Sequence, residues 1–359
     1  QFLFKNFFYY IFHLIYGKVV LPSKDQKKKL NNSIHTTYME DGREYKIFKN
    51  PETRLYTDTI HFVAVLKNNF LIEEASFQID DIKKEFAKQQ KTILKIGTPK
   101  IKKKIDGKVL SILTGGGGNN NYFHWLFDVL PRIEIYNKYN KKNELDFLLV
   151  PDYSKNFQIE TLDLLNFKKN KILSSTSYRH ISAKEIILTE HPYCIDKFNQ
   201  DELNIPIWIS QWLRKSFLFN IDNNMKNFPS KFYIDRGDSN YGDSRSIINE
   251  KEVKDYLKIL GFEMVQLGKL SFLNQVKLFN NAEYIVGLHG AGFANIVFCK
   301  ENAKVVEIRS FGAGKIIENI SIQNKLNFKK IETLPSNHDI SNQQGQIEVS
   351  LKQLKGIIN

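Results

Sequence analysis

The stretch Tyr284-Ile-Val-Gly-Leu-His-Gly-Ala-Gly-Phe-Ala-Asn295 decides the class of fold that the sequence predicts. It begins as a short apolar run, typical of a buried parallel strand, and passes through closely spaced glycines into the start of a helix. Glycines there let backbone N–H groups approach an anion, and the helix start adds partial positive charge. The spacing Gly-x-x-Gly-x-Gly differs from the dinucleotide pattern Gly-x-Gly-x-x-Gly, so it does not indicate a nicotinamide site.

Strands and helices alternate around this stretch. We expect strands at 231–235, 262–265, 284–287 and 304–308, and helices at 250–260 and 271–279. This alternation predicts a Rossmann-like, doubly wound domain. Asn249, followed three residues later by Glu252, has the pattern of a helix capping box.

The first half of the chain alternates in the same way. Strands are expected at 109–113, 147–150 and 185–189, helices at 78–90 and from Asn121 to Tyr139, and a hairpin turn at Asp106-Gly107. The sequence therefore predicts an α/β protein of two domains, 1–202 and 203–359, which face each other across a cleft. A polar linker is expected near 220–230, and the C-terminal tail is expected to pack back on the N-terminal domain.

Composition narrows the classes of function. The 359 residues are 42% hydrophobic and 25% charged, which excludes disorder, collagen and coiled coil. The formal net charge of +13 favours an anionic partner such as a phosphorylated substrate, an anionic lipid or nucleic acid. Only two cysteines are present, Cys194 and Cys299, so a disulfide framework is excluded and a reducing compartment is predicted.

The N-terminal segment 1–21 is rich in aromatic residues, and lysines follow it at positions 24 and 27–29. Its apolar run is shorter than the roughly 20 residues that a membrane-spanning helix needs. An aromatic helix beside a basic cluster is typical of a segment that lies in the interface of an anionic bilayer. Alternatively, the segment packs on the domain or contacts sequence upstream of it.

Two arginines border a polar loop after the strand at 231–235. Arg236 and Arg245 would form a clamp for a diphosphate, because guanidinium groups bind phosphate oxygens in pairs and keep their charge. Alternatively, they pair locally with Asp235, Asp238 or Asp243.

Two further residues of this half are candidates for ligand contacts. Glu307 ends the strand after the glycine turn, where an acid can accept hydrogen bonds from ribose hydroxyls. The alternative is an ordinary carboxylate paired with Lys304 or Arg309. His289 lies within the turn and would either donate to a phosphate or serve in capping and packing.

The second concentration of polar residues is Asn121-Tyr-Phe-His-Trp-Leu-Phe-Asp-Val-Leu-Pro-Arg132. A helix would align His124, Asp128 and Arg132 on one stripe, because they are four residues apart. A histidine paired with a carboxylate can serve as a general base for a hydroxyl. The alternative is a capping histidine with a buried Asp128–Arg132 ion pair. Pro131 is expected to bend or shorten the helix.

Other catalytic chemistries lack support in the sequence. No cluster of cysteines and histidines has metal-ligand spacing, and Asp80-Asp81 does not form a metal–diphosphate motif. The nucleophile elbow Gly-x-Ser-x-Gly of serine hydrolases is absent. No metal site is therefore predicted.

Taken in order, the block 121–132, the segment from Arg236 to Arg245, and the glycine turn with Asn295 and Glu307 resemble glycosyltransferase family 61. That family includes plant xylosyltransferases, animal O-linked N-acetylglucosaminyltransferases and bacterial enzymes of capsule and surface polysaccharides. The resemblance implies a GT-B architecture with an inverting mechanism. It assigns catalysis to His124 and Asp128, and an acceptor or structural role to Asn121, Trp125 and Arg132. The donor-binding residues that it implies are Arg236, Arg245, His289, Gly290, Ala291, Gly292, Asn295 and Glu307.

The expected function is transfer of a hexose or pentose from a nucleotide sugar to a hydroxyl of a surface glycan such as capsule or lipopolysaccharide. The expected partners are that donor and a glycan acceptor, which is either free or lipid-linked, without a cofactor, metal or nucleic acid. The expected location is the cytoplasm, at the inner face of the membrane if residues 1–29 contact it. The alternative is a non-catalytic, membrane-peripheral module that binds an anionic glycan or lipid.

Overall fold

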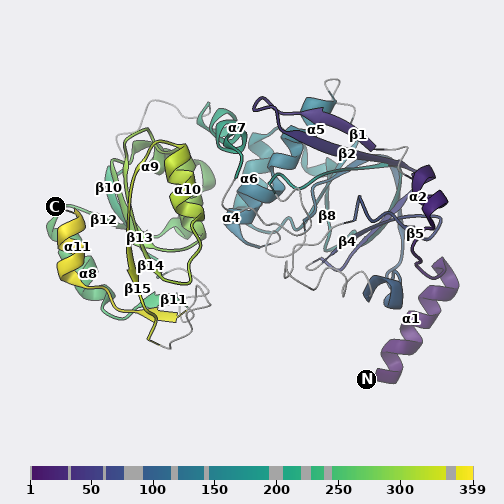
Figure 1. Cartoon of the computed structure of the whole chain (residues 1–359), viewed down its shortest axis with the longest axis horizontal. Coiled ribbons are helices and arrows are strands. Elements are labelled where there is room, and N and C mark those ends of the chain that lie inside the picture. Colours follow the sequence, from purple (N-terminus) through teal and green to yellow (C-terminus); the bar gives the residue numbers. More distant parts are fainter. Residues whose placement is uncertain are drawn as a thin grey trace. The chain divides into compact units, whose positions relative to one another are not determined.

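A computed structural model describes residues 2–30, 34–59, 62–76, 92–114, 120–140, 145–193, 205–219, 228–237, 245–336 and 345–358. The chain divides into two compact units, Gln1–Asp201 and Glu202–Asn359 (Figure 1). The predicted boundary between residues 202 and 203 lies beside this division. The predicted linker at 220–230 falls within the second unit, and residues 220–227 lie outside the described residues.

The first unit is built on a mixed sheet of nine strands. Its path runs β5-β4-β3-β9-β6-β7-β8, and β2 pairs with β9 and with β1. The elements in chain order are α1 (Phe2–Tyr16), α2 (Lys24–Leu30), β1 (Ile34–Tyr38), β2 (Glu44–Pro51), β3 (Arg54–Thr57), β4 (Val63–Lys67), β5 (Phe70–Leu71), β6 (Lys103–Ser111), α4 (Tyr122–His124), η3 (Trp125–Val129), α5 (Pro131–Tyr139), β7 (Phe147–Val150), α6 (Asn156–Leu164), η4 (Lys169–Lys171), β8 (Ile172–Ser174) and β9 (His180–Thr189).

Four strands of this sheet, β9-β6-β7-β8, pair in parallel, and the remaining pairs are antiparallel. The parallel strands are rich in buried valine, leucine and isoleucine, as strands covered on both faces require. The first unit is therefore an α/β domain with a Rossmann-like parallel region, to which antiparallel strands are added.

The hairpin predicted at Asp106-Gly107 is wrong, because these residues lie inside β6. The register of β6 against β9 shifts between Ile105 and Lys108, so the dipeptide forms a bulge in one continuous strand. A Cβ on Gly107 would come within 2.8 Å of the Asp146 side chain, whose Oδ2 accepts a hydrogen bond from the Lys108 N–H. The glycine thus serves close packing within a strand rather than a turn.

The second unit is built on a fully parallel five-stranded sheet in the order β12-β10-β13-β14-β15, and β11 and β16 form a small separate sheet. Its elements are α7 (Ile207–Leu218), β10 (Lys231–Ile234), β11 (Arg245–Ile247), α8 (Glu250–Ile259), β12 (Glu263–Val265), η7 (Leu267–Lys269), α9 (Phe272–Asn281), β13 (Tyr284–Leu288), η8 (Ala291–Phe298), β14 (Lys304–Ser310), α10 (Ile316–Gln323), β15 (Asn327–Thr333), β16 (Gly345–Ile347) and α11 (Leu351–Ile358).

Helices cover both faces of this sheet, with α8 and α11 on one side and α9 and α10 on the other (Figure 1). The strand order, counted along the main sheet, is 2-1-3-4-5, an arrangement of doubly wound nucleotide-binding folds. The predicted α/β class and the Rossmann-like second domain are confirmed. The predicted helix at 78–90 lies outside the described residues, as does Cys194, whereas Cys299 is buried.

Two expectations about the C-terminal part are corrected. The tail was expected to pack on the N-terminal domain, but Leu354 of α11 is buried in the core of the second unit, where it belongs to one cluster with Val253 and Leu257 of α8. Asn249 begins α8 without the predicted capping hydrogen bond from its side chain. Its side chain instead bonds both the N–H and the carbonyl of Val349, which ties α8 to the chain after β16.

Candidate functional site

Each unit has one point at which the order of its parallel strands reverses. In the first unit the chain runs from β6 to β7 and β8 in one direction and returns to β9 on the other side of β6. In the second unit the reversal lies between β10 and β13. Ligands of open α/β sheets bind beyond the carboxyl ends of the strands at such switch points. Both groups of predicted site residues follow these strands.

In the first unit, the predicted catalytic block forms a helix with a π-turn in its middle. The Asn121 side chain caps α4 by accepting from the N–H groups of Phe123 and His124, at 2.9 and 3.4 Å. The Leu130 N–H then bonds the carbonyl of Trp125, five residues earlier, and α5 begins at Pro131. A π-turn just before the proline spares the helix the hydrogen bond that proline cannot donate.

His124 and Asp128 form a hydrogen-bonded pair on this helix. Nδ1 of His124 lies 2.7 Å from Oδ2 of Asp128. Asp128 is buried, while the His124 side chain is 25% exposed. A carboxylate can only accept, so the pair fixes the proton of a neutral imidazole on Nδ1 and leaves its lone pair on Nε2. The geometry therefore suits a general base oriented by a buried carboxylate.

Two residues that follow β9 also hold Asp128, and sequence reasoning missed both. The Tyr193 hydroxyl donates to Oδ1 of Asp128 at 2.5 Å, and Nε2 of His191 lies 3.7 Å from Oδ2. Burial alone would raise the pKa of Asp128, but the two histidines outweigh it and hold that pKa below its usual range. Burial in turn lowers the pKa of His191 and favours its neutral form. The signal that could have found them is their position just beyond a strand that borders the switch point.

Of the other predicted residues of the block, Arg132 and Trp125 are buried and Asn121 caps the helix. Arg132 is fully buried and donates to the backbone carbonyls of Asp128 and Thr189, at 3.0 and 2.9 Å. The contact of Arg132 with Asp128 is thus made through the backbone carbonyl of that residue, where the sequence offered a side-chain ion pair. The indole N–H of Trp125 donates to the Thr161 hydroxyl of α6 at 2.9 Å, inside the core. Arg132, Trp125 and the Asn121 cap hold the helix in place.

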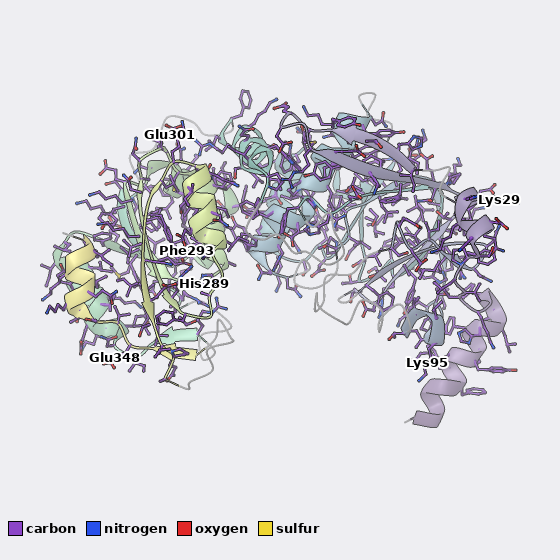
Figure 2. The ribbon with its side chains drawn as sticks, in the orientation of Figure 1. Lys29, Lys95, His289, Phe293, Glu301 and Glu348 are labelled. Carbon is purple, nitrogen blue, oxygen red and sulfur yellow. The ribbon has the colours of Figure 1, made fainter. Side chains whose placement is uncertain are left out.

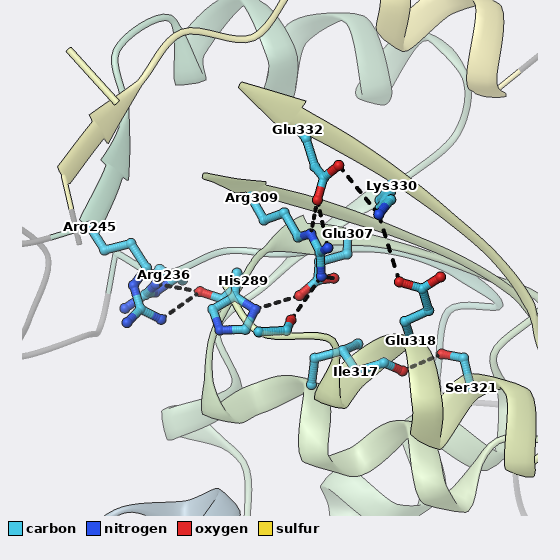
Figure 3. A network of polar contacts seen from close by, with 11 residues as sticks. Arg236, Arg245, His289, Glu307, Arg309, Ile317, Glu318, Ser321, Lys330 and Glu332 are labelled. Atoms are coloured by element: carbon cyan, nitrogen blue, oxygen red, sulfur yellow. Dashed lines mark hydrogen bonds and ion pairs between the residues drawn. The ribbon is translucent and has the colours of Figure 1, made fainter. Parts of the chain in front are cut away.

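In the second unit, two guanidinium groups converge on the glycine turn (Figure 3). Nη1 of Arg236 and Nη1 of Arg245 both donate to the backbone carbonyl of His289, at 2.9 and 3.1 Å. A Cβ on Gly290 would lie 3.3 Å from Nη1 of Arg236, so the glycine lets the guanidinium come close to the backbone. Burial and the charge of Arg236 lower the pKa of Arg245 to about 10, which leaves it charged near neutral pH. Two neighbouring cations at a switch point make this edge suitable for an anion.

Glu307 does not point to a ligand as the sequence predicted. It is fully buried, its Oε1 lies 2.5 Å from Nδ1 of His289, and its Oε2 lies 3.2 Å from Nη1 of Arg309. Arg309 in turn pairs with Glu332 on β15, at 2.6 Å (Figure 3). The expected ribose contact is corrected, because both oxygens of Glu307 already orient protein groups. The alternative pairing with Arg309 is the one that forms.

The other predicted donor residues divide into partly exposed and buried positions. Gly290, Ala291 and Gly292 are partly exposed at the start of η8, whereas Asn295 is fully buried. The Asn295 amide donates to the Gln275 side chain of α9 at 2.9 Å and to the carbonyl of Gly292 at 3.2 Å. Asn295 therefore fixes the turn from inside. Figure 2 shows His289 and Phe293 within the second unit, where Phe293 is buried.

The carboxylate of Asp235, next to Arg236 in the sequence, binds a lysine and a backbone amide. Its Oδ1 accepts from Nζ of Lys254 and from the Gly237 N–H, each at 2.9 Å. Asp238 and Asp243 lie outside the described residues. Within the ranges that the structure describes, no group of three or more histidine, cysteine or acidic residues could hold a metal ion.

The family model for glycosyltransferase 61 matches residues 122–306, which is just over half of the chain. The chain belongs to this glycosyltransferase family. The match includes the His124–Asp128 pair, both arginines and the glycine turn. The resemblance expected from the three blocks is confirmed.

Comparison with known proteins gives one curated relative and a structural neighbour. An EGF domain-specific O-linked N-acetylglucosamine transferase of Bos taurus is 32% identical over 73 residues. That stretch is 19% of this chain and 14% of the relative, so the chain spans only a small part of it. A crystal structure of TibC, a bacterial iron-containing dodecameric glycosyltransferase from enterotoxigenic E. coli, aligns over 83% of this chain and 81% of its own, with 11% identity and a TM-score of 0.26.

Proposed function

We propose that this chain is an inverting glycosyltransferase that moves a hexose or pentose from a nucleotide-sugar donor to a hydroxyl of a glycan. Family membership supports the class of reaction. An inverting displacement needs one base for the acceptor hydroxyl and a group that neutralises the leaving diphosphate. The His124–Asp128 pair of the first unit meets the first requirement, and the two arginines of the second unit meet the second.

The donor diphosphate binds, in this proposal, at the glycine turn of the second unit. Arg236 and Arg245 neutralise the charge that develops as the bond from the anomeric carbon to the phosphate oxygen breaks. The backbone N–H groups at the start of η8 provide further donors. The Nδ1–H of His289 donates a hydrogen bond to Glu307, so Nε2 carries a proton to donate to a phosphate only when the ring holds both protons.

His124 rather than Asp128 is the base that we propose. Nε2 of His124 takes the proton of the acceptor hydroxyl while that oxygen attacks the anomeric carbon. Asp128 is buried and engaged by three side chains, and its low pKa makes it a weak base. Its part is to keep the imidazole in one tautomer and to stabilise the imidazolium that forms.

The observation that carries this function is the convergence of Arg236 and Arg245 on the carbonyl of His289, beside partly exposed glycines at the switch point of a parallel sheet. Such a site is built for a phosphate group rather than for a neutral sugar. A surface-glycan acceptor such as capsule or lipopolysaccharide, and a cytoplasmic reaction, complete the proposal on the strength of the family resemblance.

Calorimetry with uridine, guanosine and adenosine diphosphate tests the donor site, and incubation with a panel of nucleotide sugars tests the reaction. We expect one diphosphate to bind and the matching nucleotide sugar to be hydrolysed slowly without an acceptor. Binding should weaken in Arg236→Lys. Absence of binding by all three diphosphates would favour the non-catalytic module instead.

A further inference from the structure

Helix α1 is apolar on two opposite faces, and only one of them packs against the protein. Phe12 is 9% exposed, whereas Leu14 and Phe7 on the other side are 70% and 62% exposed. Residues 7, 11, 14 and 15 follow the spacing of one helical face, and all four are apolar and exposed. A helix that is apolar on all sides is normally buried on all sides, so we expect this exposed face to bind a partner.

The C-terminal end of α1 is firmly attached to the first unit. The hydroxyl of Tyr16 accepts from the Lys102 N–H at 2.9 Å, and its carbonyl accepts from Nη2 of Arg54 at 3.3 Å. The Tyr16 ring also meets the ring of His180 edge-on, with 4.9 Å between the centroids. The exposed face therefore belongs to a helix that the first unit holds at its C-terminal end. Figure 1 shows this end of α1 beside the first unit.

Positive charge surrounds the attached end of α1. Lys18 and three lysines of α2, Lys24, Lys28 and Lys29, are exposed. Lys95, also exposed, precedes Gly97, whose backbone packs against the His13 ring of α1. Figure 2 shows Lys29 on α2 and Lys95 beside α1. A second copy of this chain would bring the same basic groups together, which disfavours self-association through this face.

We propose that the outer face of α1 docks into the interface of an anionic lipid bilayer, with the lysines of α2 against the lipid headgroups. Aromatic and aliphatic side chains next to a lysine cluster are the features that such surfaces bind. No helix among the described residues is long and apolar enough to cross a bilayer, so the contact would be made from one side. Docking would bring the first unit, with its His124–Asp128 pair, to the membrane surface. This inference does not depend on the transferase reaction.

Flotation of the full chain with vesicles tests the proposal. The vesicles contain phosphatidylcholine either with phosphatidylglycerol or alone, and no donor is added. We expect the chain to float with the anionic vesicles and to bind the neutral ones much less. Leu14→Glu/Ile15→Glu should weaken flotation about tenfold or more, because two inserted side chains are lost. Lys28→Gln/Lys29→Gln should weaken it about fivefold per lysine on anionic vesicles.

A matched control shows whether the location of the substitutions, rather than the introduced charge itself, weakens flotation. Leu334→Glu/Ile259→Glu makes the same substitutions at exposed residues of the second unit, 54% and 82% exposed, and should float like the wild type. Failure of the wild-type chain to float, or equal flotation of the α1 variant, would overturn the proposal. Equal binding to neutral vesicles would overturn the anionic assignment. Self-association that the α1 variant abolishes, without flotation of the wild type, would assign the face to a second copy. Diphosphate binding is measured separately, so either proposal can fail alone.

Discussion

The two switch points share a topology and differ in chemistry. Beyond β6 and β9 of the first unit, a buried carboxylate is surrounded by two histidines and a tyrosine. Beyond β10 and β13 of the second unit, two guanidinium groups meet at a glycine turn. The same sheet edge thus presents a proton acceptor in one unit and positive charge in the other. The difference teaches that the residues just after the strands, rather than the fold, set the chemistry.

The largest expected effect is on the proton-accepting side. His124→Ala should lower the transfer rate by about 10²–10⁴-fold, because the acceptor hydroxyl loses its base. Diphosphate binding to the second unit should stay within error. The rate is measured by product formation and the binding by calorimetry. His35→Ala, at an exposed histidine of β1, is the control and should transfer normally. Normal transfer by His124→Ala would remove the functional contrast between the two switch points.

The next effect concerns the cationic side. Arg236→Lys keeps the positive charge but removes the planar guanidinium that can bind two phosphate oxygens. Donor affinity should therefore fall about 10- to 100-fold, with a smaller change in kcat. The measurements are diphosphate calorimetry and the KM for the donor. Arg214→Lys is a matched control, because Arg214 also donates to backbone carbonyl groups, in its case those of Val297 and Cys299 at the far end of η8. Equal losses in both variants would show that Arg236 acts only on the backbone.

How far the sequence predicted these two edges depends on how local the signals are. The parallel strands, the glycine turn and the spacing of His124 and Asp128 are local patterns, and the structure has the elements where those patterns put them. Within β6 the local signal was misleading, because Asp106-Gly107 has the composition of a turn but lies inside one continuous strand. The glycine is explained by tertiary packing, because a side chain at position 107 would collide with Asp146.

The partners of the site residues were harder to predict because they are distant in sequence. Tyr193 reaches Asp128 across 65 residues, and Arg236 reaches the carbonyl of His289 across 53. For Glu307 the sequence offers both a ribose contact and pairing with Arg309, and its burial favours the pairing. Which polar groups of a sheet edge face inward is set by packing, which a single sequence does not display.

The first unit should also be the more sensitive to acid. Burial lowers the pKa of His180 to about 4, from about 6.5 in an unfolded chain, so the unfolded state binds more protons between these values. The contribution of this neutral histidine to the free energy of unfolding is therefore fully present above about pH 6.5. It decreases as the pH falls towards 4. The loss between pH 7 and 5 should be about 2 kcal/mol. Urea unfolding at both pH values measures it, and no loss in the first unit's transition would contradict the neutral buried state.

The smallest expected effect concerns Tyr193, a hydrogen-bond partner of Asp128 in the first unit. Tyr193→Phe removes one donor from Asp128 without changing the shape of the side chain, and kcat should fall about tenfold with KM unchanged. A carboxylate that has lost a donor holds the imidazolium of His124 more tightly. The acidic limb of the kcat/KM profile should therefore move to higher pH.

Tyr38→Phe is the control for loss of a tyrosine hydroxyl that does not touch the His124–Asp128 pair. Its hydroxyl also donates to a carboxylate, that of Glu44 at 3.2 Å, but on an exposed surface, so neither kcat nor the pH limb should change. If Tyr193→Phe lowers kcat while the acidic limb stays in place, Tyr193 supports only the packing around β9. If the limb moves, Asp128 tunes the histidine through its own partners. Tyr193 would then be a third member of the catalytic hydrogen-bond network, in which Tyr193 donates to Asp128 and Asp128 accepts from His124.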